Sequence, residues 1–185
     1  MKDAPRYLNR TVAALLALVV LSAPLSAQSR LDELFAELPV ASPDEARRIA
    51  GEIELEWSKS GSPAMDLLLR RGRDALEAEE TARAISHLGA AIDHAPGFAE
   101  AWFLRSVAFF RQERYGLALN DIAQVLAREP RHFNAILGMG RVFEETGRLQ
   151  LAHDAYMSAH TIHPHHEDIS KALERVSREL GGTDL

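Results

Sequence analysis

Histidines near the end of the chain are the residues best suited to chemistry. Neutral imidazoles bind transition metals, and Glu167 and Asp168 would add carboxylates to such a site. However, Pro164 interrupts the cluster, and the His-Glu-x-x-His pattern that places two ligands on one helix face is absent. We therefore predict no metal and no cofactor, and keep metal binding and a pH-responsive patch as alternatives. The cluster consists of His160, His163, His165 and His166.

Other catalytic arrangements are missing from the sequence. The chain has no cysteine, which removes disulfides, thiolate catalysis and cysteine-based zinc sites. No serine lies in a Gly-x-Ser-x-Gly frame, and no glycine-rich phosphate loop occurs. The carboxylate pairs at 44–45 and 144–145 are interpreted as solvated helix surface. The prediction is that the protein is not an enzyme.

The composition favours a folded helical domain. Of the 185 residues, 46% are hydrophobic, which is normal for a globular chain. Good helix formers dominate, and no alternating run of β-branched residues indicates a strand. The formal net charge is −6, and no Lys/Arg-rich stretch offsets it. Because phosphate backbones repel an acidic chain, we expect no nucleic-acid partner.

The first 27 residues have the layout of a secretory signal. Lys2, Arg6 and Arg10 precede an apolar run over 12–21, and small residues follow up to Ala27. Ten apolar residues are too few to cross a bilayer, which needs about 20. We predict cleavage after Ala27, a periplasmic location and no stable membrane span after signal removal. An uncleaved anchor is the alternative.

A 34-residue repeat organises the rest of the chain. Counting back from three equally spaced prolines, Pro96, Pro130 and Pro164, defines repeats at 65–98, 99–132 and 133–166. Large and small side chains recur at fixed offsets within them. These are Leu68, Trp102 and Ile136 at the fourth position, Gly72, Ser106 and Gly140 at the eighth, Ala75, Phe109 and Phe143 at the eleventh, and Ala84, Ala118 and Ala152 at the twentieth.

This pattern resembles the tetratricopeptide-repeat family over about 102 residues. Within each repeat the recurring positions form one stripe on each of two helices, as an antiparallel pair requires. The resemblance implies an all-α fold, a right-handed α–α superhelix of three repeats with flanking helices. The seventh position departs from the family's leucine, with Arg71, Arg105 and Met139, and Val125 replaces alanine at the twenty-seventh. These departures suggest locally altered helix spacing.

The flanks are expected to cover the ends of the stack. Residues 28–64 are interpreted as a degenerate repeat whose helix over 43–60 begins after Ser42. Ile53 and Trp57 would pack against the first helix of repeat one. The amphipathic stretch 31–38 either packs beside 43–60 or occupies a groove of this or a neighbouring subunit. Residues 167–185 hold a capping helix and tail, with the helix ending at Gly181-Gly182.

The resemblance also implies where a partner would bind, because the first helices of successive repeats line a concave groove. Trp102, Phe103 and Phe110 make the first helix of repeat two apolar nearly all round. That is consistent either with a peptide groove or with burial between neighbouring repeats. The predicted groove residues are Leu69, Arg73, Leu76, Phe103, Val107, Phe110, Arg111, Asn134, Leu137, Arg141 and Glu144.

These observations predict an exported adaptor or scaffold that binds a protein or peptide partner. A structural subunit of an envelope complex is the alternative in a different class. Some chaperone-binding relatives hold a carboxyl terminus with a Lys/Asn clamp, but most equivalent positions here lack those residue types. Only Arg73 and Asn134 offer comparable groups among Leu69, Arg73, Leu104, Asn134 and Gly138. The pattern indicates neither the partner nor the oligomeric state.

Overall fold

The computed structural model describes residues 25–182, and this part of the chain is helical with no strand. The predicted all-α fold is confirmed for this range. Residues 1–24, which carry most of the predicted signal, lie outside the described residues. The helices are α2 (Leu25–Glu37), η1 (Leu38–Val40), α3 (Pro43–Trp57), α4 (Pro63–Glu77), α5 (Thr81–His94), α6 (Ala99–Arg111), α7 (Tyr115–Leu126), α8 (Phe133–Glu145), α9 (Leu149–Ile162) and α10 (Glu167–Gly182).

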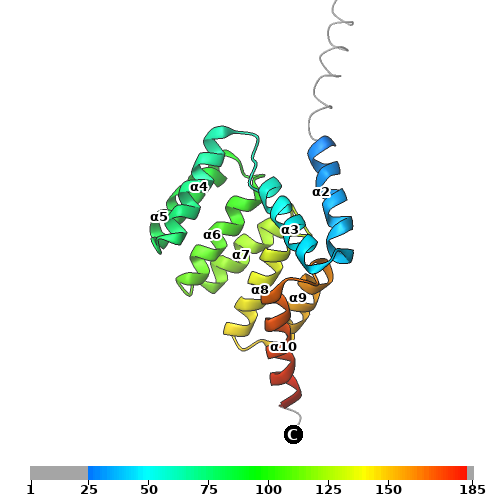
Figure 1. Ribbon diagram of the computed structural model, residues 1–185. Helices are drawn as coiled ribbons and strands as arrows, with labels where there is room; N and C mark the ends of the chain where they lie inside the picture. The colour runs from blue at the N-terminus through cyan, green and yellow to red at the C-terminus, as the bar shows by residue number, and fades with distance from the viewer. Residues whose placement is uncertain (1–24, 183–185) are drawn as a thin grey trace, which may run out of the picture.

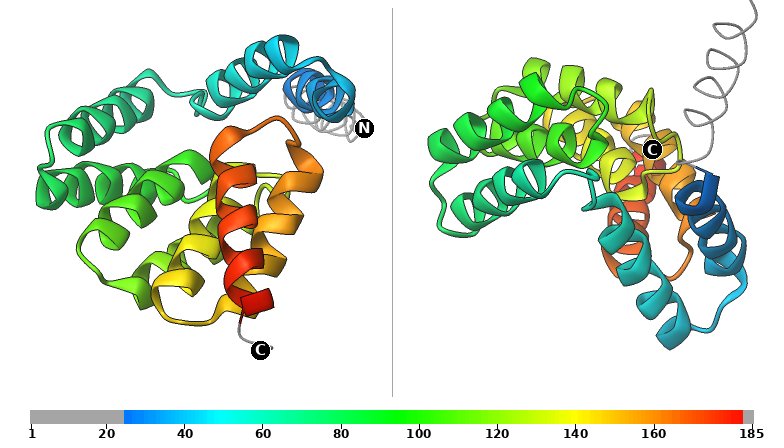
Figure 2. Two further views of the ribbon diagram at one scale, coloured as in Figure 1. Left: turned by 60° about the horizontal axis from the view of Figure 1, so that its bottom comes forward. Right: turned by 90° about the horizontal axis from the view of Figure 1, so that it is seen from above.

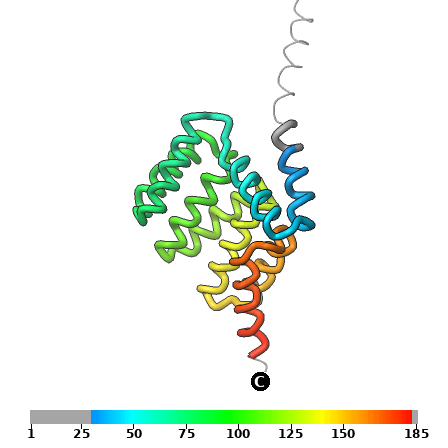
Figure 3. Tube along the Cα trace, in the orientation of Figure 1, coloured from blue at the N-terminus to red at the C-terminus, as the bar shows by residue number. Residues whose placement is uncertain are grey.

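Three antiparallel hairpins stack in chain order (Figure 1). They are α4–α5, α6–α7 and α8–α9, and each second helix packs against the first helix of the next hairpin. The first helices α4, α6 and α8 therefore lie next to one another in order. The Cα trace shows the resulting coil of hairpins (Figure 3). Stacking is required because a single helix pair cannot bury its own apolar face.

Glycine at the eighth repeat position lets the two helices of a hairpin approach closely. A Cβ on Gly72 would lie 2.5 Å from the Leu88 side chain. A Cβ on Gly140 would lie 2.5 Å from Cδ1 of Tyr156, which is fully buried. Both separations are shorter than any carbon contact allows, so these side chains occupy the space that the glycines leave.

Replacing Gly140 with alanine is expected to lower the free energy of unfolding by about 2 kcal/mol. Overpacking a dense core costs about 1–3 kcal/mol, and better helix propensity offsets up to about 1 kcal/mol. Urea unfolding measures the change. Gly51→Ala in α3 is the control, because a Cβ there meets nothing within 4 Å. That control should be neutral or slightly stabilising, and equal effects of the two substitutions would contradict the packing argument.

The first helix of every repeat is followed by a residue in the left-handed backbone conformation. Glu79, Glu113 and Gly147 occupy one repeat position, with φ of 60°, 57° and 71°. The backbone N–H of the next residue then bonds back to the helix, as Arg148 N to Phe143 O at 2.8 Å. Gly147 adopts this positive φ without strain because glycine has no Cβ, whereas the glutamates in the other two repeats adopt it at a steric cost.

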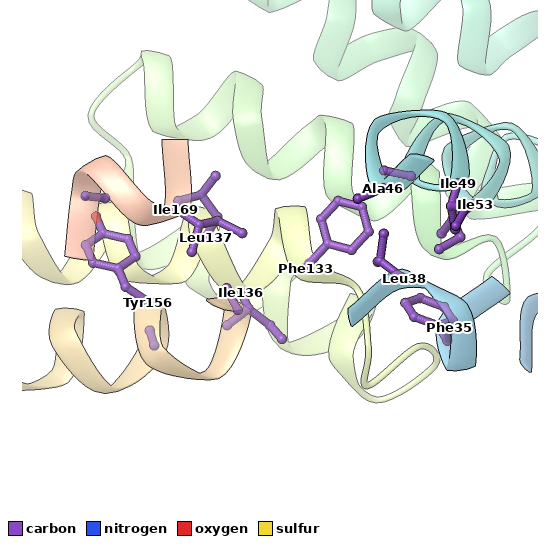
Figure 4. Close-up of a cluster of buried hydrophobic side chains, with 14 of the residues drawn as sticks. Phe35, Leu38, Ala46, Ile49, Ile53, Phe133, Ile136, Leu137, Tyr156 and Ile169 are labelled. Atoms are coloured by element: carbon purple, nitrogen blue, oxygen red, sulfur yellow. The ribbon is translucent and has the colours of Figure 1, made fainter. Parts of the chain in front are cut away.

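The N-terminal hairpin formed by α2, η1 and α3 does not extend the stack before repeat one. The prediction that Ile53 and Trp57 pack against the first helix of repeat one is wrong. Both belong to a core cluster with Phe133 and with apolar residues of α8, α9 and α10. Phe133 lies between side chains of the hairpin, including Leu38, and those of the third repeat (Figure 4). The hairpin thus lies beside the C-terminal helices (Figure 2).

A short linker allows this placement. Residues 58–62 connect α3 to α4, and Gly61 has a φ of +79° that few other residues adopt. The hairpin can therefore turn away from α4 and cover apolar side chains of the third repeat instead. The stretch 31–38 packs beside α3, through buried Leu34 and Leu38, and not in a groove.

Helix α10 covers the last repeat. Its buried side chains are Ile169, Ala172 and Val176, and it packs against α9. The helix runs through Gly182, so both glycines at the predicted end are still helical. Within this cap, the Arg175 guanidinium bonds both oxygens of Glu144 at 2.6 and 2.9 Å. That contact, followed by the Tyr156 hydroxyl, lowers the pKa of Glu144 against the effect of burial.

Candidate functional site

An open cleft of about 720 Å³ lies on the concave side of the stack. Helices α4, α6 and α8 supply one side of it, and α3 supplies the opposing wall. Because α3 is held by its own buried cluster, the cleft has two fixed walls. The lining residues are Gly51, Glu54, Leu55, Ser58, Lys59, Asp66, Leu69, Arg70, Arg73, Glu100, Phe103, Leu104 and Asn134.

A buried polar network ties the walls together. The Glu100 carboxylate, 6% exposed, accepts hydrogen bonds from Arg73 Nη2 and His132 Nε2, both at 3.2 Å. Nδ1 of His132 accepts the Ala135 backbone N–H at 3.2 Å, so Nε2 is the nitrogen that donates to Glu100. The His132 ring stacks on Trp57 with centroids 3.9 Å apart. The Glu100 carboxylate of α6 thus links α4 and the start of α8. The stack of His132 on Trp57 extends this connection to α3.

The other acidic side chains of the cleft are also engaged within the chain. Glu54 of α3 accepts a hydrogen bond from Asn134 of α8 at 2.7 Å. Asp66 accepts the hydroxyl of Ser60 at 2.6 Å and its backbone N–H at 2.8 Å, and these bonds lower the pKa of Asp66. A ligand that enters the cleft therefore meets carboxylates that already have partners.

A smaller apolar recess of about 60 Å³, called the notch here, lies between α6 and α8. Phe103 lines both the notch and the cleft, so it separates the two spaces. Arg141 contributes the charge at this recess, and its guanidinium pairs with Asp168 at 3.1 Å. The notch is lined by Phe103, Ser106, Val107, Phe110, Ile122, Gly138, Arg141 and Val142.

The structure divides the predicted groove residues into three groups. Those that line the cleft are Leu69, Arg73, Phe103 and Asn134, and those that line the notch are Phe103, Val107, Phe110 and Arg141. The remainder line neither space: Leu76 and Leu137 are 4% exposed core residues, Arg111 donates to the Leu76 carbonyl, and Glu144 pairs with Arg175. For all of these residues, contact with a ligand remains a prediction.

Sequence reasoning missed the wall formed by α3. Glu54, Leu55 and Ser58 enter the cleft from a helix that was expected to stack on repeat one. No periodic pattern indicates that placement. Arg70 and Gly138 were also left out of the predicted set, although both stand at the sixth repeat position and could have been found by comparing that position across repeats.

The departure at the seventh repeat position has a local explanation in repeat two. Arg105 forms two hydrogen bonds to the buried Asp121 of α7, at 2.7 and 2.9 Å. Its guanidinium also lies 4.9 Å from the ring centroid of Trp102. Such a planar, two-pronged pair holds the two helices of the hairpin together.

The histidine cluster is divided between core and surface. His163 is 4% exposed, while His165 is exposed. The rings of His163 and His166 lie 5.2 Å apart, and that of His163 lies edge-on to Phe133 at 5.2 Å. Among residues 25–182, no group of three or more His, Asp or Glu side chains has an arrangement that could hold a metal. Of the four histidines, His163 and His166 pack against Phe133.

None of the described helices is both long enough and apolar enough to cross a membrane.

Comparisons with known proteins agree with this architecture. A sequence profile of the tetratricopeptide repeat matches residues 69–123 and 110–166, and it describes a repeat and not a catalytic domain. A tetratricopeptide-repeat-containing protein of Rhizobium etli is 35% identical over 162 residues, covering 87% of this chain and 79% of the relative.

Solved structures show the same superhelix. The first repeat domain of Spaghetti (RPAP3) bound to an HSP90 peptide has a TM-score of 0.62 at 19% identity, covering 65% of this chain and 95% of that one. The TPR2B domain of yeast Sti1 in complex with pHsp70 has a TM-score of 0.60 at 14% identity, covering 64% of this chain and 99% of that one. The predicted fold is therefore confirmed, and the chain belongs to the tetratricopeptide-repeat family.

Proposed function

We propose that this chain is an exported, non-enzymatic adaptor that binds a segment of a partner protein in the cleft between α3 and the first helices of the repeats. The observation that supports this most directly is the cleft itself, about 720 Å³ in volume with fixed walls on both sides. A preformed site loses less conformational entropy on binding than a mobile surface does.

The chemistry of the cleft suits a peptide. Leu55 is 59% exposed on the α3 wall, and the partly exposed Phe103 lies opposite on α6. Apolar side chains of a partner would cover both. The RPAP3 domain named above is bound to an HSP90 peptide, which supports a peptide-sized ligand for a cleft on the same fold.

Export is the part of the proposal that rests on the sequence alone. Its basis is the basic start, the apolar run and the small residues before Ala27. Cleavage there would release the helical domain outside the cytoplasmic membrane, and in a cell with two membranes the destination is the periplasm.

Replacing Phe103 with serine is expected to weaken peptide binding about 30-fold, because truncating a central aromatic at an interface costs about 2 kcal/mol. Peptides are first selected from a displayed library of random 12-residue sequences, and affinities are measured by fluorescence anisotropy. The matched control is Leu117→Ser on α7, whose side chain is 39% exposed and lies outside the cleft and notch.

Thermal unfolding of each variant separates binding from folding in this test. Wild type that selects no peptide above background would refute peptide binding. An unchanged affinity in a folded Phe103→Ser variant would refute binding in the cleft.

A further inference from the structure

The sixth repeat position forms a row across the concave side. It is occupied by Arg70 in α4, Leu104 in α6 and Gly138 in α8. Since these helices are neighbours in order, equivalent positions follow one another along the stack. At one end of the row Arg70 carries a long cationic side chain, and at the other end Gly138 has no side chain. Arg70 and Leu104 line the cleft, and Gly138 lines the notch.

The cation at the first end is available to a ligand. Arg70 is exposed, and its guanidinium makes no hydrogen bond or ion pair with residues 25–182; it acts on Asp66 only as a nearby charge. The carboxylates around it are engaged elsewhere, with Asp66 bonded to Ser60 and Glu100 bonded to Arg73. In a chain of net charge −6, this end of the cleft therefore presents a positive group.

The other end of the row is apolar and unfilled. A Cβ on Gly138 would meet only Cδ1 of Ile122, at an ordinary 3.7 Å. Around that vacant position lie Phe103, Val107 and Phe110, and the notch lining contains no carboxylate. The two polar side chains of the lining are already engaged, with Ser106 bonded to the Phe103 carbonyl and Arg141 to Asp168. The recess therefore favours an aliphatic side chain, since a polar group would lose its hydration without gaining a free partner.

We propose that the cleft selects a partner segment by two side chains, an acidic one that pairs with Arg70 and an aliphatic one that enters the notch at Gly138. This inference rests on the proposed function and specifies its ligand. Packed helices lie about 8–10 Å apart, so the two ends of the row are separated by roughly 18 Å. An extended chain advances about 3.4 Å per residue, which places the two side chains about five residues apart.

The test repeats the 12-residue library selection with two substitutions. Arg70→Glu reverses the charge at one end, and its control is Arg71→Glu, because the adjacent Arg71 lines a different surface between α4 and α5. Gly138→Leu fills the notch, and its control is Gly116→Leu in α7, where a Cβ meets nothing within 4 Å. Gly138→Ala provides a milder version should the leucine disturb folding.

Wild type and both controls should select sequences with an acidic and an aliphatic residue about five positions apart. Arg70→Glu should weaken the selected peptide about tenfold and shift selection toward Lys and Arg, as expected for losing one charge-assisted hydrogen bond. Gly138→Leu should remove the aliphatic preference and keep the acidic one.

The possible failures are distinct. Enriched peptides that are indifferent to Arg70→Glu and to both Gly138 substitutions would overturn this inference and leave peptide binding intact. A wild-type selection without enrichment would remove the proposed function itself.

Discussion

Replacing Trp57 with alanine should lower the free energy of unfolding by about 4 kcal/mol and detach α3 from the third repeat. The indole is 8% exposed and contacts three rings. It stacks on His132 at 3.9 Å and lies 5.2 Å from Phe133 and 6.0 Å from Phe35. Truncating a buried aromatic of this size removes its apolar burial and leaves a cavity, which together cost about 3–5 kcal/mol.

Two measurements check this expectation. Urea unfolding gives the free energy, and amide hydrogen exchange reports whether α3 loses protection. Trp57→Phe should retain most of the stability, because the indole Nε1 has no hydrogen-bond partner among residues 25–182 to lose. Leu55→Ala, on the exposed side of the same helix, should change stability by about 0.5 kcal/mol or less. A loss below about 1 kcal/mol for Trp57→Ala, with α3 still protected, would contradict the role assigned to this cluster.

Acid should destabilise the fold through His163 by about 3 kcal/mol between pH 7 and pH 4. Burial, together with the charges of His166 and His165, lowers the pKa of His163 from 6.5 to about 4. The unfolded chain therefore binds a proton in this interval that the folded chain does not. Each unit of difference between the unfolded and folded pKa corresponds to about 1.4 kcal/mol of stability. The contribution of His163 is therefore fully present above pH 6.5 and declines toward pH 4.

His163→Gln isolates this contribution, because glutamine does not titrate. Its unfolding free energy should vary less with pH between 7 and 4.5 than that of wild type. Part of the slope should remain, since burial also lowers the pKa of His166. His165→Gln, at an exposed position of the same turn, should reduce the wild-type slope only slightly, because burial is the largest cause of the lowered His163 pKa and the charge of His165 is the smallest. Parallel pH profiles for wild type and His163→Gln would show that His163 does not carry the effect.

Much of the repeat architecture follows from local sequence. The 34-residue spacing, the small residues at position eight and the left-handed Gly147 each specify contacts within one hairpin or with the next. Such interactions depend only on near neighbours, and they recur three times, so the pattern is readable without coordinates. The burial of Leu76 and Leu137 was not predicted, because a central repeat contacts neighbours on both sides and an apolar residue fits either a groove or a core.

The N-terminal hairpin shows what the pattern could not specify. Its buried face is apolar and helical in either placement, against repeat one or against repeat three. Contacts such as Glu54 with Asn134, 80 residues apart, decide between them. The same holds for the cleft, where Asp66 and Glu100 have partners and Arg70 forms no hydrogen bond or ion pair within residues 25–182. Helix type and repeat length depend on residues close in the chain, whereas the second wall of the cleft and its unpaired charge depend on which distant surfaces meet.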